Sequence, residues 1–166
     1  MGNKKTIISA ALTIATATTF GFNHFVDAKG SDNSHKQGKA KNVIVFVGDG
    51  MGAAHREAIR LATVGQTGKL AMDDMPYAGL VHTSSTTAIT DSAAAATAMA
   101  SGVKTYNGAI GVDANKKSVK TVLEMAKEAG KSTGLVTTSQ ITDATPAAFG
   151  AHVTDRSKQS DIAKEY

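Results

Sequence analysis

The chain has 166 residues, enough for one domain with a real hydrophobic core, and its 42% hydrophobic content is typical of a soluble globular protein. It contains no cysteine, which excludes disulfides, thiolate catalysis and cysteine metal sites. The formal net charge of +4 comes from residues 1–41, which hold six lysines against two aspartates, whereas the remainder is neutral. The charge therefore predicts no nucleic-acid-binding face.

The amino-terminal segment has the pattern of an export signal. Lys4 and Lys5 precede an uncharged stretch over residues 6–22, and Val26 and Ala28 stand at the two positions that a signal peptidase reads. Threonines make this stretch less apolar than a membrane span of about 20 residues, so no stable membrane anchor is expected after cleavage. We expect an exported protein that is secreted, periplasmic or associated with the cell envelope. Its predicted parts are a signal peptide over 1–28, a flexible linker over 29–41 and a folded domain over 42–166.

Strands and helices are predicted to alternate along the domain. Continuous apolar or β-branched runs predict strands over residues 43–47, 79–83 and 134–138. Apolar periodicity and alanine content predict helices over residues 53–64, from Ser92 to a stop at Gly102, and along a stripe from Val119 to Ala126 that Gly130 ends. Thr121 and Glu124 have the spacing of a capping box in the third of these helices. This order predicts an α/β fold whose mainly parallel sheet carries helices on both faces. Functional residues should then gather at the carboxyl ends of the strands.

Ser92 is the candidate nucleophile, because it opens the alanine-rich helix directly after Asp91. The first turn of a helix has unpaired backbone N–H groups and the positive end of the helix dipole, which suit an anion such as phosphate. The alternative is that Asp91 or Ser92 only caps an ordinary helix. A third interpretation is a serine hydrolase with a catalytic triad. It is weak, because Ser92 lacks the Gly-x-Ser-x-Gly elbow of those enzymes.

The loop over residues 48–53 follows the first predicted strand and fits the glycine-rich dinucleotide fingerprint, with Asp73 and Asp74 about 20 residues further on. Asp49 argues against this function, because a carboxylate inside the loop would repel a pyrophosphate unless a cation stood between them. A carboxylate flanked by glycines at the end of a strand suits a divalent metal, so Asp49 is predicted to be a metal ligand. The alternative is an acidic turn residue.

Two further segments carry candidate functional residues near the end of the chain. Asp143 and Thr145 precede Pro146, which suits the first turn of a helix, and their oxygens are better ligands for magnesium than for zinc. Taken alone, this segment is a helix cap. Arg156 is one of three arginines in the chain, and its guanidinium matches phosphate oxygens in a bidentate fork. The alternative for Arg156 is an ordinary surface residue.

Taken together, these segments resemble an alkaline phosphatase from about Lys41 to the end of the chain. The resemblance rests on Val-Gly-Asp-Gly-Met-Gly around Asp49, Asp-Ser-Ala-x-x-Ala-Thr around Ser92, Gly-Val-Lys-Thr-Tyr-Asn-Gly at 102–108, and Asp-Ala-Thr-Pro-Ala-Ala followed by His-Val-Thr-x-Arg. Four such motifs in the same order make the resemblance specific.

The resemblance implies hydrolysis of phosphate monoesters through a phosphoserine at Ser92. It implies that Asp49 bridges zinc and magnesium, that Asp143 and Thr145 hold magnesium, and that Arg156 with help from Asp91 clamps the phosphoryl oxygens. A homodimer is also expected on this basis. The family's remaining zinc ligands and a magnesium-binding glutamate come from sequence that would follow Tyr166, and the resemblance does not make His152 a ligand. The alternative function is therefore a catalytically empty fragment that keeps the fold of its source.

Overall fold

The structure is a computed structural model that describes residues 40–166, so the predicted signal peptide and nearly all of the predicted linker lie outside the described residues. Residues 45–166 form one compact unit, which contains every described helix. These helices are α1 (Ala53–Val64), the short 3-10 helix η1 (Ala71–Asp74), α2 (Ser92–Ser101), α3 (Val122–Glu128), α4 (Ala144–Gly150) and α5 (Gln159–Glu165).

Helix α2 begins and ends at the residues that the sequence predicts. Asp91 is its N-cap, and the Asp91 side chain accepts a hydrogen bond from the backbone N–H of Ala94 at 2.9 Å. Gly102 ends it in the left-handed conformation at φ 74°, which glycine adopts without a steric penalty. Ser92 therefore occupies the first helical position, where backbone N–H groups point out of the helix.

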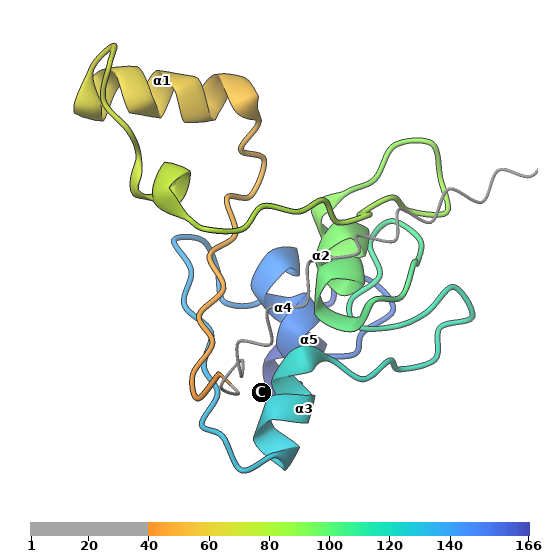
Figure 1. Ribbon diagram of the computed structural model, residues 1–166. Coiled ribbons are helices and arrows are strands. Elements are labelled where there is room, and N and C mark those ends of the chain that lie inside the picture. The colour runs from red at the N-terminus through yellow and green to blue at the C-terminus, as the bar shows by residue number, and fades with distance from the viewer. Residues whose placement is uncertain (1–39) are drawn as a thin grey trace, which may run out of the picture. The chain divides into compact units, whose positions relative to one another are not determined.

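The core of this unit forms where α2 packs against α4 (Figure 1). The contact consists of small side chains, because Ala93 on α2 and Ala144 and Ala147 on α4 are fully buried or nearly so. Ile162 of α5 and Ile110 of the loop after α2 add the larger apolar side chains to the same cluster. The close approach of two alanine faces fixes the amino-terminal ends of α2 and α4, which carry Ser92 and Asp143, relative to each other.

A buried threonine ties α2 to the loop that follows it. The Thr97 hydroxyl donates to the carbonyl oxygen of Ala109 at 3.1 Å and accepts from the N–H of Gly111 at 3.0 Å. Between these two residues, Ile110 forms an antiparallel bridge with Val153. The loop is thus attached to α2 on one side and to the segment leading to Arg156 on the other.

The predicted strands are not formed in the described residues, where the only β-pairing consists of two isolated bridges, Ile110 with Val153 and Val112 with Ser118. The segments 43–47, 79–83 and 134–138 have no ladder partner in the described chain, and most of their apolar side chains are exposed, as for Phe46 at 89% and Val136 at 99%. A strand is stable only beside another strand. The β-branched pattern alone therefore overpredicted strand structure for the described chain.

The three predicted helices are present in the described chain. Helix α1 has the predicted bounds, yet none of its residues is buried, so its apolar stripe has no packing partner in the described chain. Helix α3 starts at Val122, later than its apolar stripe, and the predicted capping box between Thr121 and Glu124 is present. Helices η1 and α5 were not predicted. None of the helices in residues 40–166 is long and apolar enough to cross a membrane.

Candidate active site

Arg156 and Ser92 are in direct contact although 64 residues separate them in the chain. The Nη1 atom of Arg156 donates a hydrogen bond to the Oγ of Ser92 at 2.8 Å. Ser92 stands on the first turn of α2, and Arg156 follows the segment that pairs with Ile110. A hydroxyl and a guanidinium are thereby presented together, the pair of groups needed to attack a phosphorus atom and to hold its oxygens.

Two carboxylates flank the guanidinium. Arg156 Nη1 lies 3.5 Å from Oδ2 of Asp91, and Nη2 lies 3.0 Å from Oδ1 of Asp143. The Arg156 side chain remains 37% exposed, so an anion from solvent can reach it. The carboxylates fix the plane of the guanidinium and leave part of its N–H fork for a ligand.

Asp143 also caps α4, the helix that carries Thr145. Its carboxylate accepts from the hydroxyl of Ser139 at 2.8 Å and from the N–H of Ala144 at 2.9 Å. The Ser139 hydroxyl and the Ala144 N–H, with a lesser contribution from Arg156, lower the pKa of Asp143 below its usual value and outweigh the opposing effect of burial. Asp143 is therefore an anion at neutral pH, and its charge orients the arginine.

Asp49 and Thr145 meet across 96 residues of sequence. The Thr145 hydroxyl donates to Oδ2 of Asp49 at 2.8 Å. A carboxylate and a hydroxyl oxygen so close together fit part of a magnesium shell, which takes about six oxygen ligands. The described residues contain no group of three or more His, Asp or Glu side chains arranged to hold a metal, and Asp49 is the one zinc ligand that the family resemblance supplies. The described residues thus fit part of a magnesium shell.

The six predicted site residues fall into two contacting groups. Ser92, Asp91, Asp143 and Arg156 form the first through hydrogen bonds and ion pairs. Asp49 and Thr145 form the second, and Thr145 follows Asp143 by two residues on the first turn of α4. Asp73, which a dinucleotide site would use for the ribose, instead pairs with Arg56 and bonds the N–H of Leu70.

His152 lies outside these groups. Its Nδ1 is 2.6 Å from the carbonyl oxygen of Gly111, and its Nε2 is 2.9 Å from Oε1 of Glu124. Burial works to lower the pKa of His152, but the Gly111 carbonyl and the Glu124 carboxylate together raise it above its ordinary value. Both ring nitrogens face acceptors, so the ring connects the loop at Gly111 to the first turn of α3 at Glu124.

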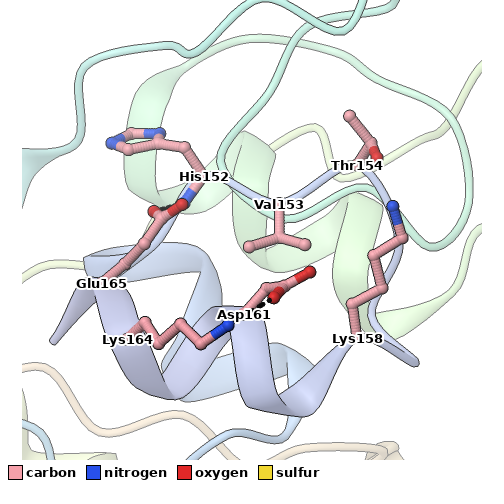
Figure 2. A pocket seen from close by; sticks show the side chains of 7 residues that line it. All are labelled: His152, Val153, Thr154, Lys158, Asp161, Lys164 and Glu165. Atoms are coloured by element: carbon pink, nitrogen blue, oxygen red, sulfur yellow. Dashed lines mark hydrogen bonds and ion pairs between the residues drawn. The ribbon is translucent and has the colours of Figure 1, made fainter.

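A shallow pocket lies beside His152, between the segment 152–154 and α5, and it is lined by none of the six predicted site residues (Figure 2). Lys158 and Lys164 bring positive charge to it, while Asp161 and Glu165 bring negative charge. Figure 2 shows the Glu165 carboxylate turned toward the backbone N–H of His152, to which it is hydrogen-bonded. The pocket has a balanced charge and no candidate nucleophile.

Sequence reasoning assigned no role to two groups of residues that contact the site. One is Ser139, whose hydroxyl bonds Asp143. The other is the turn of residues 106–108: the Asn107 side chain bonds the backbone on both sides of Thr90, and the N–H of Gly108 donates to Oδ2 of Asp91 at 2.9 Å. The motif at 102–108 was a signal for the second group, but only the fold shows what it contacts.

The comparisons with known proteins agree on one family. The sequence model of the alkaline phosphatase family matches residues 40–165. Alkaline phosphatase 4 of Bacillus subtilis is 47% identical over 165 residues, which is 95% of this chain and 36% of the relative. The chain therefore spans about a third of the length of this relative.

Solved structures give the same result. The alkaline phosphatase from the Antarctic bacterium TAB5 is 39% identical with a TM-score of 0.65, covering 70% of this chain and 34% of that chain. A variant of the TAB5 enzyme solved with magnesium bound is 42% identical with a TM-score of 0.59, covering 64% and 31%. The described residues thus share the alkaline phosphatase fold with a part of each of these proteins.

Proposed function

The chain belongs to the alkaline phosphatase family, and from that premise we propose that it supplies the nucleophile and the anion clamp for hydrolysis of phosphate monoesters. The observation that carries the proposal is the 2.8 Å contact between Arg156 Nη1 and Ser92 Oγ. A guanidinium held against a helix-terminal serine places the phosphoryl group directly over the nucleophile.

In the proposed reaction, Ser92 Oγ attacks phosphorus while the bond from phosphorus to the alcohol oxygen breaks. The alcohol oxygen leaves with the proton that the Ser92 hydroxyl loses, and Ser92 carries the phosphoryl group. Water then attacks phosphorus, the bond to Oγ breaks, and inorganic phosphate leaves as the serine hydroxyl is restored. Arg156 holds the non-bridging oxygens in both steps, and Asp91 and Asp143 keep its plane fixed.

Asp49, Asp143 and Thr145 would hold magnesium, with Asp49 also contacting zinc. Bound metal supplies a Lewis acid and lowers the pKa of a nucleophile beside it. The contact of Thr145 with Asp49 supports this assignment, since both oxygens would turn from each other toward a shared cation. Asp143, whose described contacts are with Arg156, Ser139 and Ala144, would serve from the edge of that site.

The remaining predictions extend the proposal to a protein of family length. We infer that segments 43–47, 79–83 and 134–138 become strands of a mainly parallel sheet when sequence corresponding to the rest of the relatives covers their exposed apolar side chains. We also propose export, cleavage of the signal near Ala28, and a homodimer. Amino-terminal sequencing of the exported protein tests the cleavage, because a start at Met1 or Gly2 would contradict it.

The second candidate function is a fragment without catalysis. The number of zinc ligands favours it: a catalytic zinc takes about three protein ligands and an open position, whereas the family resemblance supplies Asp49 alone. We expect the chain alone to turn over p-nitrophenyl phosphate poorly with added zinc and magnesium. A chimera that joins residues 40–166 to the remaining part of Bacillus subtilis alkaline phosphatase 4 should be active.

The experiment compares that chimera with its Ser92→Ala variant, and metal content is measured for both. Loss of turnover at unchanged metal content supports Ser92 as the nucleophile. Unchanged turnover in the Ser92→Ala chimera would reject the assignment. Full turnover in the 166-residue chain alone would reject the argument from ligand count.

A further inference from the structure

We propose that the turn of residues 106–108 is a positioning device, which holds the nucleophile segment and the arginine segment at a fixed separation. The inference rests on the proposed function. It assigns to that function residues that position the reacting groups and take no part in the reaction themselves. The turn contacts both segments through different atoms, and neither contact was predicted from sequence.

On the nucleophile side, the turn is hydrogen-bonded to the residues just before Ser92. The Nδ2 of Asn107 donates to the carbonyl oxygen of Ile89 at 2.8 Å, and its Oδ1 accepts from the N–H of Asp91 at 3.3 Å. The N–H of Gly108 donates to Oδ2 of Asp91 at 2.9 Å. Oδ1 of Asp91 caps α2 at the same time, so the turn fixes the entry of the chain into that helix.

On the arginine side, the turn holds the backbone next to the guanidinium. The carbonyl oxygen of Gly108 accepts from the N–H of Arg156 at 2.8 Å. The hydroxyl of Tyr106 donates to the carbonyl oxygen of Thr154 at 2.9 Å, two residues before Arg156. The N–H of Gly108 thus contacts the Asp91 carboxylate, and the carbonyl of Gly108 contacts the Arg156 backbone. The two peptide groups beside Gly108 therefore join Arg156 to the carboxylate that flanks its guanidinium.

The geometry of the turn depends on glycine. Gly108 has φ 86°, in the left-handed region where a side chain is strained, although a Cβ there would meet no atom within 4 Å. Substitution by alanine thus acts on the backbone conformation and not by a clash. Gly130, at the end of α3, has φ 75° and equally open space, and its N–H donates to the carbonyl oxygen of Lys127, which is not a site residue. It is a matched control.

The first test uses the 166-residue chain and needs no catalysis. Hydrogen exchange of the Arg156 amide reports its bond to Gly108, and the rates of interior α2 amides report global opening. In Gly108→Ala, we expect the ratio of the Arg156 rate to the α2 rates to rise about tenfold, because the strained turn releases this bond. In Gly130→Ala the ratio should stay at the wild-type value.

The second test measures inhibition by inorganic phosphate in the metal-loaded chimera. Displacement of Arg156 from Ser92 should raise the inhibition constant of phosphate about tenfold in Gly108→Ala and leave it unchanged in Gly130→Ala. Tyr106→Phe removes one hydroxyl without backbone strain and should raise the constant about fivefold. Tyr77→Phe is its control, since Tyr77 is 84% exposed.

The outcomes separate the two proposals. Equal exchange-rate ratios and equal phosphate inhibition constants in Gly108→Ala and Gly130→Ala would overturn the positioning role. If Gly108→Ala does not fold, a wild-type inhibition constant in Tyr106→Phe would overturn it. An active Ser92→Ala chimera would instead overturn the proposed function. The exchange result in the short chain does not depend on turnover, so it decides the positioning role in either case.

Discussion

Replacing Thr97 with valine tests the buried attachment between α2 and the loop that carries the 106–108 turn. Valine has nearly the same shape as threonine and a similar helix propensity, so the change removes one hydroxyl and little else. Thr97 is fully buried, as are Ala109 and Gly111, whose backbone groups the hydroxyl bonds.

The expected cost follows from those two hydrogen bonds. Without the hydroxyl, the Ala109 carbonyl and the Gly111 N–H remain buried without this partner, and each such group costs about 1–3 kcal/mol. The added methyl returns about 0.8 kcal/mol of hydrophobic stabilisation. The free energy of unfolding should therefore fall by about 1–5 kcal/mol, a large part of the roughly 5–15 kcal/mol that stabilises a small domain.

The assay is urea unfolding of the 166-residue chain, followed by circular dichroism of the helices. Thr63→Val is the matched control, because Thr63 lies exposed on α1 and its hydroxyl bonds only the Ile59 carbonyl one turn back. That control should stay within about 0.5 kcal/mol of wild type. A Thr97→Val chain whose free energy of unfolding also stays within about 0.5 kcal/mol would refute the reasoning, since its two orphaned backbone groups would then have found other partners.

Three further predictions concern single side chains of the described fold. Arg156→Lys should raise the dissociation constant of inorganic phosphate about tenfold in the metal-loaded chimera, measured by calorimetry, because an ammonium cannot make the planar fork; equal affinity would contradict the clamp. Asp91→Ala should lower the unfolding free energy by about 1 kcal/mol through loss of the α2 cap, whereas Asp91→Asn should keep most of it. The raised pKa of His152 predicts stability that is fully present below about pH 6.5 and lost as the pH rises through the folded value. Urea unfolding of wild type and His152→Gln should therefore differ more at pH 5.5 than at pH 9, and a pH-independent difference would contradict the pairing with Glu124.

Local signals in the sequence predicted the elements that local physics controls. The cap at Asp91, the left-handed stop at Gly102 and the capping box from Thr121 to Glu124 each involve residues within one or two helical turns. Such contacts can be read from spacing alone. Five of the six predicted site residues stand beside a glycine, a cap or a helix start, whereas Arg156 was singled out because its guanidinium matches phosphate oxygens.

Long-range contacts were not accessible to the same reasoning. The strand patterns at 43–47 and 134–138 describe side chains that need a neighbouring strand, and sequence periodicity does not show whether the described chain provides one. The contacts of Asn107 with Ile89 and Asp91 depend on how a loop folds back over 16 to 18 residues. Ser139 was missed for a different reason: it lies only four residues before Asp143, but it stands outside α4, where no helical spacing pointed to its hydroxyl.

The alanine contact between α2 and α4 has a consequence for how the distance from Ser92 to Asp143 responds to heat. Alanine has no side-chain torsion to populate, so packing Ala93 against Ala144 and Ala147 loses no rotamer entropy and offers no alternative rotamers. The spacing of the two helix starts is then set by backbone approach alone. Warming a contact of leucines or methionines populates new side-chain states and lets the helices shift, whereas this interface has no such states to populate. The separation of nucleophile and arginine-orienting carboxylate should accordingly stay constant until the unit unfolds.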